Sequence, residues 1–535
     1  MRAAKEKFLI LRDIIYKGFC IILLLLFFYV ILQKGYTILT YDTPKELREM
    51  NTVVFAYNFA YGKNLYSVST LGNEVPAATS IYGFLVPLLM SPFIRLFAFS
   101  TLNALQICEL LTFIVEITGA FFFYRFLFRK TKSLLLAIVG MLLFYSCYWR
   151  YSAFGGAFPD QWGITLSIIL MDRLQVDKQK HRYHPMLYAA LIISLFYIKQ
   201  YFVLTAIGLC IYLFLHSRKD WQKFIVYGML MGSISVLFVS VAFPLYFSET
   251  FPIAQGQTLT GSPDYSLQQI KKLSLYYGYI IVFAILRISM EIYTMIKKKC
   301  VLKEISYELC QIIFILPILF RIAENQGTNY TYYLQLWYPY IIAYSIVSIS
   351  KVTESLKQLP DSKKFFGIYS AITCLFLALS VKNIMPSFSC TFMTKEQQNA
   401  WDNAYAILER YSSEGEILVS MHLSGFCLEN NIPTTSYGQA EYNSVENLMK
   451  YKNNKIWRNI FLFDYAKEIL QNNISYSETV KENIYNHKYY CIALVYAGEY
   501  GLSEADLINA GYHIMTSEEL MTGSQCWNTN FYVYE

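Results

Sequence analysis

Residues 1–385 alternate between long apolar runs and short polar segments. The runs are too uniformly apolar for the one-sided pattern of a soluble helix, and they predict helices that cross a membrane. They cover residues 18–33, 81–99, 102–128, 134–150, 160–172, 187–215, 224–246, 273–296, 306–323, 329–350 and 365–382. The run 187–215 is too long for one span, and we expect two short helices that meet near Lys199.

Clusters of Lys and Arg between the runs predict which loops face the cytoplasm. They lie at residues 2–17, 129–132, 173–182, 218–223, 297–303 and 351–364. An even number of crossings must separate neighbouring clusters, yet three runs lie before the second cluster. The run 81–99 carries Pro87, Pro92 and Arg95, so we expect it to be a helix embedded in the outer surface. The N-terminus is then cytoplasmic, and the chain crosses the membrane about eleven times.

The composition changes from about residue 390. Residues 397–413 have the pattern of a polar helix, and 414–425, 455–465 and 489–498 look like buried strands. We therefore expect an α-helical polytopic membrane domain, residues 1–385, whose first outer loop covers 34–101. An extracytoplasmic α/β domain follows at 386–535. Its four cysteines could pair in an oxidising compartment, although their spacing does not require it.

Composition supports this class. Hydrophobic residues make up 55% of the 535 residues, aromatic residues 17% and charged residues 16%, which is unlike any soluble globular protein. The net charge of +7 comes from short loops between apolar runs, so it reflects topology and not a nucleic-acid surface. No Cys or His spacing indicates a zinc or redox site.

Acidic residues follow the first apolar run directly. Asp42, Glu46 and Glu49, with Arg48 among them, lie between two apolar segments of the first outer loop. If this segment is helical, Glu46 and Glu49 share a face. A carboxylate beside apolar surface is a candidate general base, because burial raises its pKa. The alternative is a solvated amphipathic helix capped by Thr43.

Two further charges lie at predicted outer helix ends. Asp160 and Arg150 flank a Gly-Gly turn, where Asp160 either caps the next helix or faces a ligand that approaches the glycines closely. Lys199, followed by Gln200, interrupts an apolar run. An ionisable residue within the membrane indicates function, and a phosphate is a natural partner for its ammonium group. Snorkelling to the interface is the structural alternative.

A third outer segment is rich in polar and aromatic residues. Arg321 ends one predicted span, and Asn329 and Tyr330 begin the next. Such residues suit a sugar or a lipid headgroup, and they also suit an ordinary aromatic belt. Within the spans, Glu109 and Glu116 share one helix face, with Arg125 or Arg95 as expected partners. A proton-coupled transporter would also use such acids.

Together these features resemble the GT-C superfamily of polytopic glycosyltransferases, which includes the aminoarabinose transferases and protein O-mannosyltransferases. The resemblance covers about residues 1–350. It rests on the order of the outer-loop acids, the Gly62 to Tyr66 turn, the Tyr82-Gly83 helix start, Asp160 and Lys199.

The resemblance implies transfer of a sugar from a polyprenyl-phosphate donor to a glycan or lipid-linked acceptor at the outer face. Glu46 or Glu49 would be the base and Asp160 a second carboxylate, while Lys199 with Arg48 or Arg321 would hold the leaving phosphate. The family's Asp-Glu pair is replaced by ELRE here, so Asp42 also competes as the base. Dependence on a divalent metal varies in the superfamily, and no ligand set in this sequence forces one.

Two other functions fit the sequence. A transporter or flippase of a lipid-linked substrate would favour duplicated halves, and we find none. A catalytically inactive accessory protein of glycan assembly would explain the missing Asp-Glu pair. The Lys, Asn, Tyr and Ile content, without a sorting motif, indicates a bacterial plasma membrane.

Overall fold

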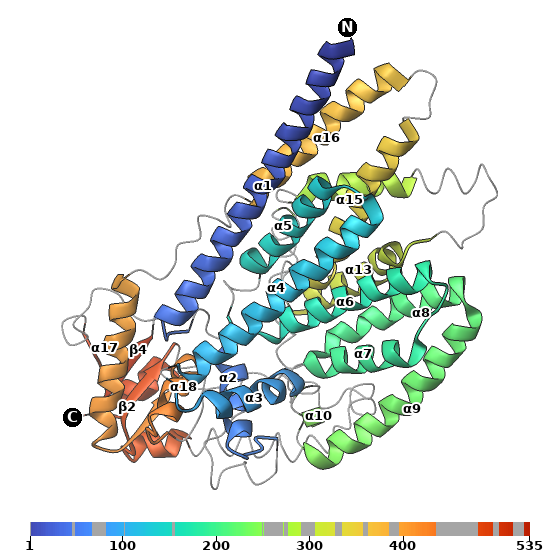
Figure 1. Ribbon diagram of the computed structural model, residues 1–535. Helices are drawn as coiled ribbons and strands as arrows, with labels where there is room; N and C mark the ends of the chain where they lie inside the picture. The colour runs from blue at the N-terminus through green and yellow to red at the C-terminus, as the bar shows by residue number, and fades with distance from the viewer. Residues whose placement is uncertain are drawn as a thin grey trace.

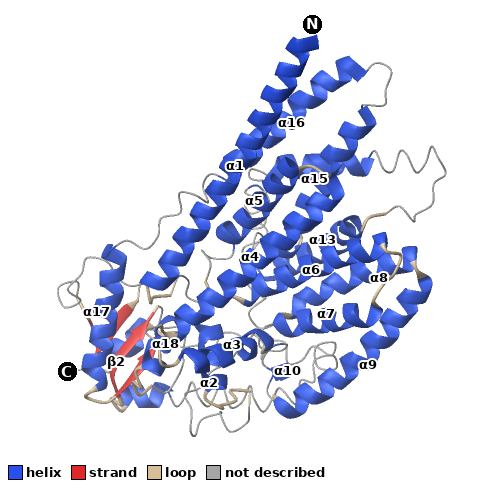
Figure 2. Ribbon diagram, viewed as in Figure 1, coloured by secondary structure: helices blue, strands red, loops and turns tan. Residues whose placement is uncertain are grey.

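The computed structural model is mostly helical, with one small sheet near the C-terminus (Figures 1 and 2). It describes residues 2–44, 49–66, 82–100, 102–151, 156–244, 246–248, 250, 271, 277–289, 305–326, 334–356, 362–384, 395–434, 480–495, 502–516 and 529–534. Within these ranges, 3 helices are long and apolar enough to cross a membrane. They belong to α1 (Arg2–Thr40), α4 (Ala104–Thr131) and α9 (Arg218–Ala242). The chain is therefore a multi-pass membrane protein.

The other apolar runs also form helices. They are α5 (Leu134–Tyr151), α6 (Pro159–Gln179), α7 (Pro185–Ile198), α8 (Thr205–His216), α13 (Tyr307–Gln326), α15 (Tyr338–Leu356) and α16 (Ser362–Ile384), with a further helix over 277–289. Local sequence signals fix where two of the helices begin. Asn103 and Gln106 form a capping box at the start of α4, and Pro159 opens α6 where its missing N–H costs nothing.

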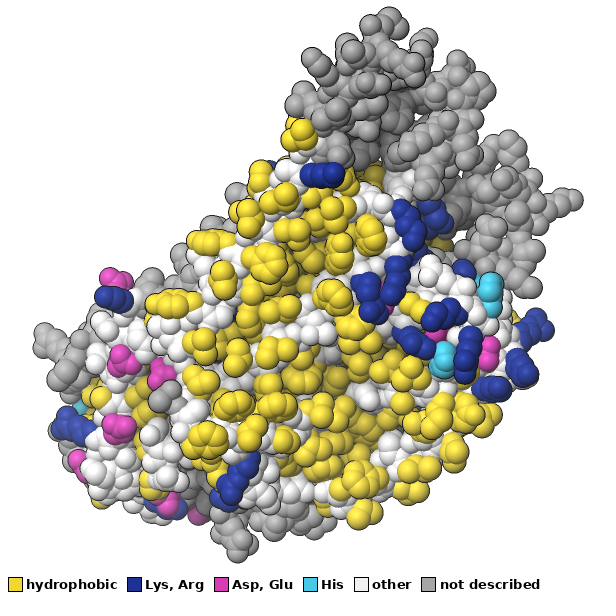
Figure 3. All heavy atoms as spheres, in the orientation of Figure 1, with side chains coloured by type: hydrophobic (Ala, Val, Ile, Leu, Met, Phe, Trp, Pro, Cys, Tyr) yellow, Lys and Arg dark blue, Asp and Glu magenta, His cyan; other side chains and the backbone are white. Residues whose placement is uncertain are grey.

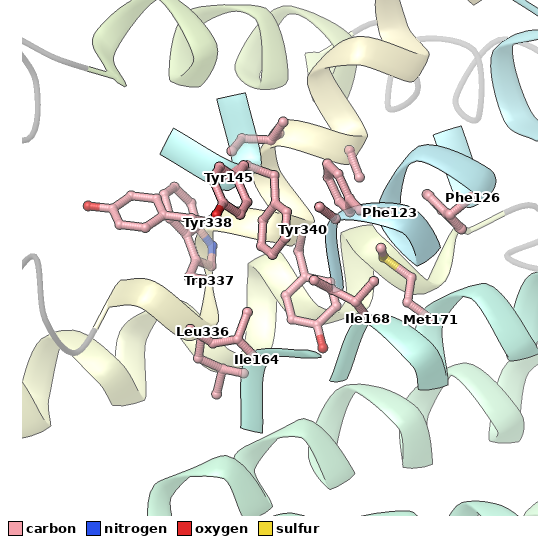
Figure 4. Packing of buried hydrophobic residues seen from close by; sticks show 14 of the residues in the cluster. Phe123, Phe126, Tyr145, Ile164, Ile168, Met171, Leu336, Trp337, Tyr338 and Tyr340 are labelled. Carbon is pink, nitrogen blue, oxygen red and sulfur yellow. The ribbon is translucent and has the colours of Figure 1, made fainter. Parts of the chain in front are cut away.

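The core of the bundle lies where α4, α5, α6 and α15 meet. Aromatic and branched side chains from all four helices interlock there, among them Phe123, Tyr145, Ile168 and Tyr340 (Figure 4). Tyr340 also meets Tyr307 of α13 edge to face, with ring centroids 5.8 Å apart. This packing fixes the helices whose ends carry the candidate site.

The break within 187–215 is confirmed. Lys199 has an extended backbone, ends α7 and precedes the short 3-10 helix η3 (Gln200–Leu204), after which α8 begins. Gly163 of α6 lies against the break, since a Cβ there would sit 2.3 Å from the Phe202 ring. The glycine allows η3 to pack directly on α6.

The buried acid Glu116 has a different partner from the one expected. It forms a salt bridge with Lys34 of α1, while Arg125 pairs with Asp172 of α6. Arg125 lies nine positions after Glu116 on the same helix, which places it on the opposite face. The expected pairing with Arg125 is therefore wrong, and the observed pair joins α1 to α4.

Two short helices lie between α1 and α4. Helix α2 (Glu49–Ala60) packs along α3 (Leu85–Phe97). α3 has 13 residues, too few to span a bilayer. One of its faces is buried, with Val86, Met90 and Ile94, while Leu89 and Leu96 on the other face are exposed.

A C-terminal unit, defined as residues 395–434, 480–495, 502–516 and 529–534, contains a 4-stranded sheet of order β1-β2-β4-β3. The strands are β1 (Glu416–Val419), β2 (Tyr489–Leu494), β3 (His513–Ile514) and β4 (Asn530–Val533), and only β1 and β2 are parallel. Alternate residues face two cores, one under α17 (Lys395–Ser412) and α18 (Met421–Glu429) and one under α22 (Glu504–Asn509).

The structure confirms the predicted polar helix as α17 and the predicted strand over 489–498 as β2. The predicted strand over 414–425 is confirmed only as β1; its second half was wrongly predicted, because α18 begins at Met421. β3 and β4 were not predicted, and the predicted strand over 455–465 lies outside the described residues. Cys427 and Cys491 are buried free thiols on one side of the sheet; the other two cysteines are likewise outside the described ranges.

The surface divides into three regions. A broad apolar band crosses the helical bundle, and Lys and Arg side chains gather at one end of it, over the ends of α6, α8 and α9 (Figure 3). The C-terminal unit lies at the other end, beside α2 and α3. The basic loops and the C-terminal unit are thus on opposite sides of the band.

Candidate active site

Of the acids in the predicted outer loop, Glu49 lies within the bundle. It is the first residue of α2 and is fully buried. Its Oε2 accepts a hydrogen bond from the backbone N–H of Ala157 at 2.8 Å. A Cβ on Gly156 would lie 2.3 Å from the same oxygen. Gly156 thus leaves room for the carboxylate of Glu49, whereas the sequence suggested the approach of a ligand.

Asp160 lies three residues beyond Ala157, in the first turn of α6. Its carboxylate is fully buried and accepts hydrogen bonds from Lys199 Nζ, at 3.1 Å to Oδ1 and 3.0 Å to Oδ2. The hydroxyl of Tyr201 donates to Oδ1 as well. The backbone from Ala157 to Asp160 spans at most about 11 Å, so the carboxylates of Glu49 and Asp160 lie in the same part of the bundle.

Lys199 is held by charge and by aromatic rings. Its ammonium lies 4.6 Å from the ring centroid of Tyr82 and 5.4 Å from that of Tyr201. The side chain is only 8% exposed. The ring faces and the carboxylate of Asp160 both attract a cation, so they hold the ammonium group in place. Lys199 is therefore a desolvated cation fixed at a helix break.

The Tyr82-Gly83 segment reaches this break through a close backbone contact. Gly83 N–H donates to the carbonyl of Ile198 at 3.2 Å, and a Cβ on Gly83 would lie 1.8 Å from the carbonyl oxygen of Tyr197. Any larger residue would separate the two segments. The hydroxyl of Tyr66 donates to the Tyr82 carbonyl at 3.3 Å, which ties the Gly62 to Tyr66 turn to the same place.

The remaining predicted residues either contact other groups or have side chains outside the part of the chain that the structure describes. Gln200 Nε2 donates to the Thr250 carbonyl at 3.5 Å. Asp42 is exposed, and its Oδ1 accepts from Gln398 of α17 at 3.4 Å. Arg321 lies in α13, where the structure describes the backbone but not this side chain. The predicted residues outside the described ranges are Glu46, Arg48, Asn329 and Tyr330.

Sequence reasoning missed Tyr201, which contacts both members of the ion pair. The available signal was its position two residues after Lys199 in the motif FYIKQYF. It also missed the role of Gly83 and Gly156, whose close contacts depend on partners distant in sequence.

A divalent metal does not fit the described carboxylates. Both oxygens of Asp160 face the Lys199 ammonium, so a metal there would have to displace a like charge. Within the part of the chain that the structure describes, no group of three or more His, Cys, Asp or Glu side chains could hold a metal ion. The cation at this carboxylate is a lysine.

Neither a protein-family model nor a curated protein matches the chain. Among solved structures, the apo form of an oligosaccharyltransferase from Archaeoglobus fulgidus is similar, with a TM-score of 0.52 and 11% identity over 91% of this chain and 72% of that one. That enzyme is a GT-C glycosyltransferase. This chain has the GT-C fold. The same enzyme tethered with an acceptor peptide gives a TM-score of 0.49 at 9% identity, with the same coverage.

The likeness confirms the fold that the sequence resemblance implies. In this fold Asp160 of α6 pairs with Lys199 at the end of α7, and Glu49 of α2 binds the backbone three residues before Asp160. The number of membrane crossings stays a prediction.

Proposed function

We propose that this GT-C protein transfers a sugar from a polyprenyl-phosphate-type lipid donor to an acceptor glycan or lipid at the outer face of the membrane. The observation that carries the proposal is the buried ammonium of Lys199, held by Asp160 and two tyrosine rings. The buried carboxylate of Glu49 accepts the backbone N–H of Ala157, three residues before Asp160. A cation next to candidate bases suits a reaction in which a phosphate leaves as a hydroxyl attacks.

The reaction divides between these groups. A carboxylate of the first outer loop, Glu49 or Glu46, takes the proton from the acceptor hydroxyl. The oxygen then bonds to the anomeric carbon, and the bond from that carbon to the phosphate oxygen breaks, leaving its electron pair on the phosphate. Lys199 stabilises the charge that develops there, while Asp160 and Tyr201 orient Lys199. Attack opposite the leaving group inverts the anomeric centre.

Helix direction supports an outer location. Asp160 begins α6 and Lys199 ends α7, whereas the basic residues Lys178, Arg182 and Arg218 lie at or beyond the opposite ends of α6, α7 and α8. Basic loops face the cytoplasm. The site, together with α3 and the C-terminal unit beside it, would then face the outside of a bacterial plasma membrane.

The proposal is tested by incubating the purified protein with a panel of polyprenyl-phosphate and polyprenyl-pyrophosphate sugars and measuring the release of the lipid phosphate. Lys199→Gln and Glu49→Gln should lower release. Lys130→Gln is the matched control, because Lys130 pairs with the buried Glu308 at 3.3 Å at the far end of α4. If no donor is consumed, or if the control loses as much activity as Lys199→Gln, a transporter or an inactive accessory protein replaces this proposal.

A further inference from the structure

A cavity lies between α2, the start of α4 and the C-terminal unit. It has a volume of about 380 Å³, which is within the range of small-molecule sites, about 300–1,000 Å³. Met50 and Val53 of α2 and Leu105 of α4 form an apolar floor, and Tyr405 of α17 and Phe426 of α18 form a wall. The cavity plays no part in the chemistry proposed above.

The wall and rim have the chemistry of a carbohydrate site. The rings of Tyr405 and Phe426 stack in parallel, with centroids 3.9 Å apart and planes at 4°, and both rings are partly exposed. Asp42, Asn103 and Glu429 supply carboxylate and amide groups around this surface. Because the two rings cover each other's inner faces, their outer faces and edges are what remains for a ligand. An aromatic face beside a few convergent polar groups orients a ring that has one apolar face and a hydroxyl edge.

The charge of the cavity excludes anionic ligands. None of the described residues that line it is Lys, Arg or His, while two are carboxylates. Burial raises the pKa of Glu429 to about 7, and the nearby Asp42 contributes to the rise. Glu429 Oε1 accepts the N–H of Ala104 at the start of α4, so its side chain is fixed. A phosphate, sulfate or uronate would meet like charge here.

The cavity and the candidate base share one helix. Met50 follows Glu49 directly, and Val53 lies one turn further along α2, about 6 Å along the helix axis. A sugar bound over Met50 and Val53 would therefore be within one or two sugar lengths of the carboxylate that receives the acceptor proton.

We propose that this cavity is a subsite for a neutral or amino-substituted sugar unit of the acceptor. The inference rests on the proposed transferase function and names the acceptor's chemical class. It places the acceptor chain between α2 and α18, while the donor phosphate lies at Lys199.

The test measures sugar binding by the full-length protein in lipid nanodiscs, without donor, by saturation-transfer NMR titration. The probes are the methyl glycosides of glucose, glucosamine and glucuronic acid. The glucosamine and glucose glycosides should bind about ten-fold or more tightly than the glucuronide. Phe426→Leu should weaken binding of all three. The double change Asp42→Asn with Glu429→Gln should remove the discrimination against the glucuronide. Glu409→Gln, an exposed carboxylate on α17, should change nothing.

The outcomes separate this inference from the transferase function. If no sugar binds, if the glucuronide binds as well as glucosamine, or if folded cavity variants bind like wild type, the subsite is refuted, whatever the donor assay shows. If sugars bind as expected while no lipid donor is consumed, the cavity stands as a carbohydrate site and the transferase proposal fails. Melting temperatures of each variant verify that it is folded.

Discussion

The ion pair between Asp160 and Lys199 allows the structural and chemical roles of Lys199 to be separated. Both side chains are buried, and both carboxylate oxygens lie within 3.1 Å of the ammonium. Lys199→Met leaves a buried carboxylate without its cation, and Asp160→Asn leaves a buried cation without its carboxylate. Breaking such a pair from one side costs about 3–5 kcal/mol of unfolding free energy.

Removing both charges has a different effect. The double variant Asp160→Asn with Lys199→Met buries no uncompensated charge, and neutral replacement of a buried pair is often harmless to stability. We expect its stability to return to within about 1 kcal/mol of wild type. Its turnover should stay about 100- to 1,000-fold low, the usual effect of losing one group that stabilises charge in the transition state.

Two assays decide between the roles. Thermal unfolding in detergent, followed by tryptophan fluorescence, should rank both single variants below the double variant and wild type. Lipid-phosphate release should be low in Lys199→Met and in the double variant alike. A double variant as unstable as the single variants would refute the ion-pair argument, and one that recovers turnover would refute the role of Lys199 at the phosphate.

Further predictions concern glycine packing, metal dependence and pH. Gly156→Ala should lower lipid-phosphate release, because its Cβ would lie 2.3 Å from Glu49 Oε2 and must displace that carboxylate; wild-type turnover would contradict this. Turnover should continue in excess chelator, since a lysine occupies the Asp160 oxygens; loss restored by Mg²⁺ would show otherwise. Burial lowers the pKa of His422 from 6.5 to about 3, so the C-terminal unit should lose up to about 5 kcal/mol of stability as the pH falls from 6.5 towards 3. Hydrogen exchange of α18 in the full chain measures this loss, and His422→Gln should reduce it. The raised pKa of Glu429 has the opposite effect on pH dependence. The stabilisation of the folded state that it gives is complete below pH 4.5 and is lost as the pH rises through about 7. Glu429→Gln should therefore increase the hydrogen-exchange protection of α18 at pH 8 by about 1–3 kcal/mol relative to wild type.

Local patterns made part of this structure predictable. Apolar runs became helices, and the charge at Lys199 marked the break between α7 and η3. Short apolar stretches indicated the buried strands β1 and β2 but not the two-residue β3, which is too short to show a pattern. These features depend on residues that are close in the chain.

Contacts between distant segments were not predictable in the same way. The partner of Glu116 is Lys34, which lies 82 positions earlier, and only the packing of α1 on α4 brings them together. Gly156 was expected to face a ligand, and no packing role was predicted for Gly83, yet each accommodates a specific group from another segment. A single sequence shows that such a residue is small but not which neighbour requires it to be so.

Helix α2 connects these observations, because it carries Glu49 at one end and contacts the C-terminal unit along its length. Gly425 of α18 lies against Met50, and a Cβ there would come within 2.7 Å of the methionine sulfur. Glu49, the preceding residue, is fixed in turn by the N–H of Ala157. Because Met50 and Glu49 are adjacent, we expect a change in the docking of α18 to shift the carboxylate relative to Asp160 and Lys199. The C-terminal unit therefore positions the proposed base as well as lining the acceptor cavity, and substitutions at the contact between Gly425 and Met50 should reduce turnover without touching any group that reacts.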